Sequence, residues 1–115
     1  MNIGDLEKAK EYYQSSLKIR KEQFGPNHVD VAISYHYLGI VYSKTGDLEK
    51  AKEYYQRALE ITKEQFSPNH IQFSELYNNL GVAYWKAGDP EKAKDCFQWA
   101  LEIRKEQLGP NHVDV

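Results

Sequence analysis

Three histidines share one short sequence context, and their types and spacing are the feature of the chain that most suggests chemistry. His28, His70 and His112 each follow a Pro-Asn dipeptide, and successive copies lie 42 residues apart. Neutral imidazole is a common metal ligand, so a zinc site has to be considered. Zinc needs its ligands about 2 Å from a single point, whereas stacked helical units lie roughly 9–10 Å apart. If the spacing reflects stacked repeats, the three rings cannot converge, and we expect no metal site.

The same spacing recurs along the whole chain. The sequence GDLEKAKEYYQ begins at Gly4 and at Gly46, and the related GDPEKAKDCFQ begins at Gly88. The first two units are identical at about 25 of their 42 positions, which indicates a true internal repeat. The chain is therefore expected to form one array over residues 1–115, with units 4–45, 46–87 and a partial unit 88–115.

Each unit has the hydrophobic pattern of two helices. Residues 47–66 place apolar side chains three and four positions apart, which is typical of an amphipathic helix, and shorter helices are expected at about 29–44 and 71–86. Gly46 is suited to ending one helix in the left-handed conformation, and Asp47 is suited to capping the next.

The repeated phrase FGPNH is expected to connect the long helix to the short one. Gly25 can adopt a left-handed conformation, and Pro26 cannot continue the helix. Either Asn27 or His28 can then cap the following helix by accepting a backbone N–H bond. Ser67 replaces this glycine in the second copy, so a weaker helix end is expected there.

Composition excludes several classes of function. The net charge of −2 is not that of a nucleic-acid-binding protein, and no apolar run approaches the roughly 18 residues of a membrane span. The start of the chain is too polar for a signal peptide, and the single cysteine, Cys96, rules out an intramolecular disulfide, so we expect a cytoplasmic protein. The sequence contains no phosphate loop, zinc motif or nucleophile elbow, and we expect neither catalysis nor a cofactor.

A second motif points to a family. The pattern Y-x-x-L-G-x-x-Y occurs at residues 35–42 and 77–84, and small residues such as Ala51 and Ala93 follow it in the next helix. This resembles the tetratricopeptide repeat (TPR), and the 42-residue period is similar to the kinesin light chain type of that repeat. The resemblance implies an all-α fold, a right-handed α-solenoid of antiparallel helix pairs (a TPR-like superhelix) with about five helices.

The resemblance also implies a function and a binding surface. In TPR proteins the shorter helix of each unit lines a concave face that binds peptides, so we expect a non-catalytic protein–protein interaction scaffold with a peptide or protein ligand. Glu75 disfavours the subtype that binds a free C-terminal carboxylate. An amide such as Asn79 suits a peptide backbone, although a plain surface role for Asn78 and Asn79 is left open. The expected concave positions are Ile33, His36, Tyr37, Ile40, Lys44, Glu75, Asn78, Asn79, Val82 and Lys86.

A different class of function is also consistent with the repeat. The chain opens on a long helix that lacks its partner and closes where the next short helix should begin, so we expect a fragment of a longer array. Uncapped repeat faces favour association. The alternative to a binding module is therefore a structural, self-associating solenoid unit, assembled end to end or by helix exchange.

Overall fold

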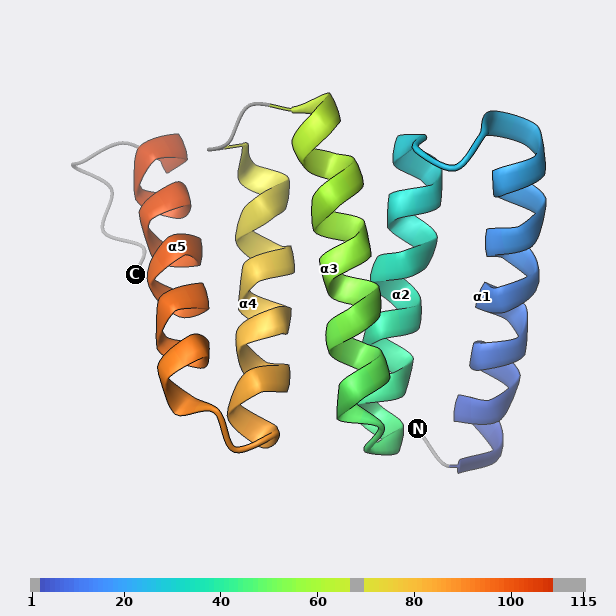
Figure 1. The fold of residues 1–115 in the computed structure, drawn as a ribbon, viewed down its shortest axis with the longest axis horizontal. Helices are drawn as coiled ribbons and strands as arrows, with labels where there is room; N and C mark the ends of the chain where they lie inside the picture. Colours follow the sequence, from blue (N-terminus) through green and yellow to red (C-terminus); the bar gives the residue numbers. More distant parts are fainter. Residues whose placement is uncertain (1–2, 67–69, 109–115) are drawn as a thin grey trace.

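The helix boundaries follow the pattern of apolar residues and caps. A computed structural model describes residues 3–66 and 70–108, and its helices succeed one another in a row with short connections (Figure 1). The described residues form helices and contain no strand. The prediction of an all-α chain with about five helices is therefore confirmed. The helices are α1 (Ile3–Phe24), α2 (Val29–Thr45), α3 (Leu48–Gln65), α4 (Ile71–Lys86) and α5 (Pro90–Leu108).

Glycine and aspartate form the junctions between α2 and α3 and between α4 and α5. Gly46 and Gly88 have φ values of 90° and 86°, in the left-handed region where a side chain would be strained. At the start of each following helix an aspartate carboxylate accepts a backbone N–H bond, at 3.3 Å for Asp47 and 3.2 Å for Asp89. These local features end one helix and start the next as the sequence predicts.

The connection from α1 to α2 is closed by a glycine and a histidine. Gly25 has a φ of 88°. His28 is the capping residue, because its Nδ1 accepts the backbone N–H of Asp30 at 3.0 Å. The imidazole also stacks on Phe24, with ring centroids 4.5 Å apart, so the last residue of α1 supports the first cap of α2. Of the two capping residues left open by the sequence, the structure selects His28.

The second copy of this connection repeats the arrangement. His70 Nδ1 accepts the backbone N–H of Gln72 at 3.2 Å, and its ring stacks on Phe66 at 4.2 Å. The expected weak helix end at Ser67, and the turn around His112, lie outside the described residues. The two described members of the histidine series therefore act as helix caps, and each stacks on the aromatic residue four positions before it.

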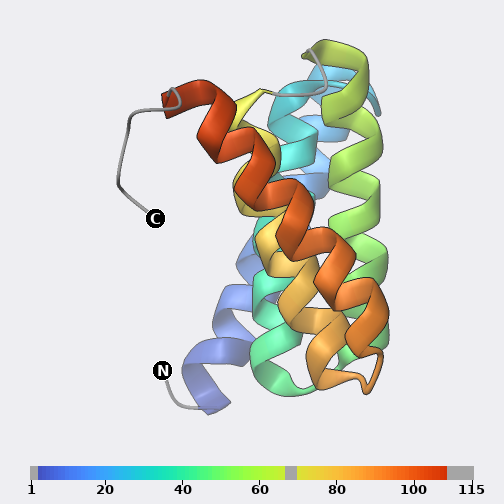
Figure 2. The same ribbon diagram turned by 90° about the vertical axis from the view of Figure 1, so that its left-hand side faces the viewer.

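The helices stack so that each contacts its neighbours in the sequence. The antiparallel pairs α2–α3 and α4–α5 form the most extensive contacts, α1 packs on α2, and α3 packs on α4 (Figure 1). The pairs are not parallel copies, because α5 is inclined to α3 when the molecule is viewed from the side (Figure 2). Helix pairs that repeat along one direction with a rotation between them form a solenoid.

The core depends on small residues that allow two helices of a pair to approach closely. Ala51 and Ala58 of α3 are completely buried, and Ala93 of α5 is 1% exposed. At Gly39 of α2, an added Cβ would lie 2.6 Å from the ring of Tyr55 on α3. The tyrosine ring therefore occupies the space that any larger residue at this position would need.

Hydrogen bonds between arginine and serine side chains join α1 to α2 and α4 to α5. Arg20 of α1 donates to the hydroxyl of Ser34 at 3.1 Å, and Arg104 of α5 donates to the hydroxyl of Ser74 at 3.2 Å. Ser34 is fully buried and Ser74 is 2% exposed, so both hydroxyls need such partners. Arg20 and Arg104 occupy the same position of the repeat, and Thr62 replaces them in the middle copy.

Several lysines on the solvated outer face of the long helices lie over tyrosine rings. The ammonium groups of Lys10 and Lys50 lie 5.5 Å and 5.4 Å from the ring centroid of Tyr42. Lys52 and Lys92 lie at similar distances from the ring of Tyr84. The aliphatic parts of these side chains therefore cover aromatic surface while their charges stay near water.

Cys96 is a packing residue. Its side chain is 8% exposed, and burial, together with the nearby charge of Asp95, raises the pKa of the thiol. The thiolate is the reactive form of cysteine, so both effects make this residue a poor nucleophile. Cys96 therefore fills space within the core cluster.

Candidate binding groove

A cavity of about 230 Å³ opens between the N-terminal halves of α2 and α4. The two helices provide its walls, and one residue of α3 contributes to its lining. The lining combines aliphatic, aromatic, amide and carboxylate side chains, which is the mixture found in most ligand sites. The lining residues are Val29, Ala32, Ile33, His36, Tyr37, Thr62, Gln72, Glu75 and Leu76.

The cavity brings together four of the ten residues that the sequence indicates for the concave face. The other six lie elsewhere on α2 and α4. Asn79 is half-buried and contacts His36, whereas Ile40 and Val82 are half-buried nearer the C-terminal ends of their helices. Lys44, Asn78 and Lys86 are exposed. The residues that line the cavity are Ile33, His36, Tyr37 and Glu75.

The sequence pattern did not indicate the other five lining residues. Val29 and Gln72 lie on the faces of α2 and α4 that carry the expected positions, but nearer the N-terminus of each helix. The helical period of 3.6 residues could have found them by extending each expected stripe by one turn. The other three lining residues are buried: Ala32 and Leu76 are 4% exposed, and Thr62 is 2% exposed. A sequence pattern indicates only that such residues belong to the core, so the coordinates are needed to show that they border a cavity.

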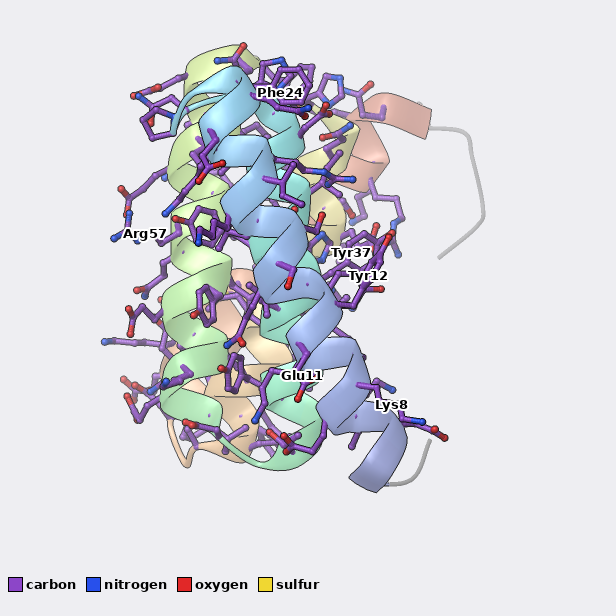
Figure 3. All side chains as sticks on the ribbon, turned by 90° about the vertical axis from the view of Figure 1, so that its right-hand side faces the viewer. Lys8, Glu11, Tyr12, Phe24, Tyr37 and Arg57 are labelled. Carbon is purple, nitrogen blue, oxygen red and sulfur yellow. The ribbon has the colours of Figure 1, made fainter. Side chains whose placement is uncertain are left out.

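The face of α2 and α4 that carries the cavity, called the groove below, lies on the opposite side of the array from the outer surface around Arg57. Viewed along the row of helices from α1, the side chains of Tyr37 and Tyr12 project to one side of the molecule, and that of Arg57 projects to the other (Figure 3). Tyr37 belongs to α2 and Arg57 to α3, so the two helices of this pair present different faces to the surroundings.

A hydrogen bond between side chains fixes α2 relative to α4 beside the cavity. The amide nitrogen of Asn79 lies 2.8 Å from Nε2 of His36. An amide nitrogen can only donate, so Nε2 accepts and the neutral ring carries its proton on Nδ1. Burial lowers the pKa of His36, and the Glu75 carboxylate partly opposes that shift. The side chain of Asn79 therefore orders the groove, in addition to any contact it makes with a ligand.

Aromatic contacts hold the groove rings in place. The ring of Tyr37 stacks on Tyr13 of α1, with centroids 5.2 Å apart and planes 9° from parallel. His36 meets the ring of Tyr55 edge-on at 5.9 Å. Burial, and secondarily the Glu75 carboxylate, raises the pKa of Tyr55, so this phenol stays neutral beneath the groove. Side chains fixed by such contacts lose little further freedom when a ligand binds.

The charges on this face are separated along the helices. While His36 is neutral, Glu75 is the residue of the cavity lining that carries a full charge. The Glu75 side chain is exposed to solvent. Lys44 and Lys86 belong to the last turns of α2 and α4. At 1.5 Å per residue, Lys86 is about 16 Å further along α4 than Glu75. The cavity end of the groove is therefore acidic, and the opposite end is basic.

The pH dependence of stability should report on the His36–Asn79 contact. A histidine whose pKa is lowered by folding takes up protons more readily when unfolded, so its contribution to stability is complete above the unfolded pKa of about 6.5. That contribution is lost as the pH falls below 6.5 toward the lower folded pKa. We expect His36→Gln to reduce the loss of unfolding free energy between pH 7.5 and pH 5.5. Urea unfolding at the two pH values measures this, and an identical loss in both proteins would contradict the buried, neutral ring.

The comparisons with known proteins place the chain in a family. The profile of the tetratricopeptide repeat family matches residues 1–64 and 44–106, which together cover most of the chain. The chain belongs to the tetratricopeptide repeat family. A search of curated proteins gave no match.

A solved structure provides a more particular likeness. The chain is similar to BtubC (BKLC) from P. vanneervenii, a kinesin light chain-like TPR protein, with a TM-score of 0.82 and 32% sequence identity. The match covers 96% of this chain and 44% of BtubC, so the chain spans less than half of the protein it resembles. The solenoid fold and the kinesin light chain type of repeat, both predicted from the sequence, are confirmed.

Two further observations concern metals and membranes. In the described part of the chain, no three histidine, cysteine or acidic side chains gather closely enough to hold a metal ion. No helix within residues 3–66 and 70–108 is long and apolar enough to cross a membrane.

Proposed function

We propose that the chain is a non-catalytic interaction module that binds a segment of another protein in the groove between α2 and α4. The tetratricopeptide repeat family suggests a protein-interaction scaffold, and the cavity beside His36 and Glu75 is the observation that supports this particular face. Its walls combine apolar surface with a few fixed polar groups, which suits an extended or helical peptide. The compartment in which the chain acts stays a prediction from its composition, as the cytoplasm.

A screen of immobilised peptides tests the proposal. The chain should bind a subset of peptides, and Glu75→Lys should remove or change that subset, because it reverses the charge at the cavity. Asn79→Ala should lower the affinity for the same peptides, because it removes the hydrogen bond that holds α2 against α4. Glu53→Lys is the matched control, since Glu53 is an exposed acid of α3 outside the cavity lining. Peptides that bind all four proteins equally would contradict a role for the groove.

A second candidate function rests on a different surface. A cavity of about 300 Å³ on α4 and α5 is almost entirely apolar, and Trp85 and Leu101 on its border are 64% and 42% exposed. Leu59, which occupies the same repeat position as Leu101, is only 6% exposed because α4 packs on α3. An exposed patch of this kind supports the alternative of a solenoid unit that associates through its helix faces.

Light scattering coupled to size-exclusion chromatography distinguishes the two candidates. A self-associating unit should increase in mass with concentration, and Leu101→Glu should return it to the monomer mass. A chain that stays monomeric at the highest concentration, while it still binds peptides, favours the interaction module. A chain that assembles but binds no peptide favours the structural unit.

A further inference from the structure

We propose that the cavity between α2 and α4 is a subsite for a cationic side chain, an arginine, of the bound segment. This inference rests on the proposed function and specifies its ligand. The cavity lining combines apolar side chains with one carboxylate, that of Glu75. Arginine is the side chain that combines an aliphatic stem with a planar cationic head.

The apolar part of the cavity lining suits the aliphatic stem of an arginine side chain. Val29, Ala32 and Ile33 line it from α2, and Leu76 lines it from α4. Ile33 is 38% exposed, so an incoming methylene chain would cover surface that is now in contact with water. Burial of such apolar surface is favourable. A small polar side chain would leave these walls uncovered.

The charged part of the cavity, the Glu75 carboxylate, suits the guanidinium group of an arginine. Glu75 is exposed at the cavity, and within residues 3–66 and 70–108 no ion pair joins its carboxylate to a basic side chain. Glu75 is a lining residue of the cavity, and its charge acts on both His36 and Tyr55. His36 is neutral, so it does not compensate the carboxylate. An incoming cation would supply the missing positive charge.

Arginine fits this end better than lysine. A guanidinium presents its donors in a planar fork that pairs with a carboxylate through two hydrogen bonds. Gln72 lines the same cavity three residues before Glu75, one helical turn away, and its carbonyl oxygen provides a further acceptor. An acidic or phosphorylated side chain would meet the Glu75 carboxylate and be repelled.

A titration with a minimal probe tests the subsite while the natural partner is still unidentified. N-acetyl-arginine methylamide is added to the isotopically labelled chain, and amide chemical shifts are followed by NMR. We expect saturable shifts confined to the residues around Ile33, His36 and Glu75. The neutral isostere, N-acetyl-citrulline methylamide, should bind about fivefold more weakly, the size expected for one solvent-accessible ion pair.

Two substitutions make the result specific. Glu75→Gln should lower the affinity for the arginine probe to that for citrulline, whereas Glu53→Gln, an exposed acid on α3, should leave it unchanged. Both residues are exposed, so neither change threatens folding. Equal affinity for the two probes, an unchanged affinity in Glu75→Gln, or shifts scattered over every acidic surface would overturn the subsite.

The failure of this inference is distinguishable from failure of the proposed function. If the peptide screen returns groove-dependent ligands that contain no basic residue, the arginine subsite is wrong and the interaction module stands. If the arginine probe saturates the cavity but no peptide binds there, the subsite is supported and the broader function is not.

Discussion

Phe73→Ala should destabilise the protein by about 3–5 kcal/mol, the range found when a buried phenylalanine is truncated. Phe73 is 1% exposed, near the start of α4, and belongs to the same buried cluster as Val31 and Ile103. Truncation to alanine removes a ring from this cluster, in a helix that packs on α3 and on α5. Because a domain is stable by only about 5–15 kcal/mol, a loss of this size is a large fraction of the total. Urea unfolding followed by circular dichroism measures it.

The control for this prediction is an aromatic residue on the surface. Tyr12 is 68% exposed, so Tyr12→Ala should change the unfolding free energy by about 0.5 kcal/mol or less. Phe73→Leu, which keeps most of the apolar volume, should fall between the two. If Phe73→Ala cost less than about 1 kcal/mol, α4 could not be packed in the solenoid as described.

Gly39→Ala should also destabilise the chain, by about 1–3 kcal/mol, although alanine is the better helix former. In an open helix this change is favourable by roughly 1 kcal/mol. Here the new Cβ would lie 2.6 Å from two ring carbons of Tyr55, and that ring is 2% exposed and confined by the core. The α2–α3 pair must separate or the ring must move, so the steric cost exceeds the gain in helix propensity. Thermal and urea unfolding measure the net effect.

A pair of comparisons shows whether the tyrosine ring is the cause. Gly4→Ala, at an exposed position in the first turn of α1, should be neutral or slightly stabilising. Tyr55→Leu should cost less in the Gly39→Ala background than in the natural sequence, because the two residues touch and their effects are coupled. A stabilising effect of Gly39→Ala alone would contradict the close approach of these helices.

The sequence predicts most of the fold because the fold is built from local signals that repeat. Gly46, with its left-handed conformation, and Asp47, with its capping carboxylate, act on neighbouring residues, so their roles can be read without coordinates. The small residues at Gly39 and Ala51 likewise indicate a close helix pair, and both are buried in the structure. Periodicity then fixes which face of each helix turns inward.

The candidate site was less predictable because its main side-chain contact does not follow the 42-residue period. The partner of His36 is Asn79, 43 residues further on, whereas the 42-residue period pairs His36 with Asn78. The repeat relates equivalent positions of successive units, and it does not predict that these two side chains touch. The position of the cavity at the N-terminal halves of α2 and α4 was also not in the pattern, since it depends on how side chains of three helices fill the space between them.

The lysines near Tyr42 illustrate a further limit. A mixed-charge pattern on the long helices indicates an exposed face, but it does not tell whether an ammonium lies over a ring or in water. Lys10 comes from α1 and Lys50 from α3, and both approach the same tyrosine of α2. Such a contact depends on the packing of three helices, which only the coordinates provide.

The central claim is that a polypeptide segment binds on the α2–α4 face of a stacked helical array, and paramagnetic relaxation tests it most directly. A peptide selected from the screen is spin-labelled at one end and added to the isotopically labelled chain. We expect selective broadening of amide signals around Ile33, Tyr37 and Glu75, with the signals around Arg57 on the outer face unaffected. Broadening centred on Arg57, or spread evenly from α1 to α5, would contradict binding on the α2–α4 face.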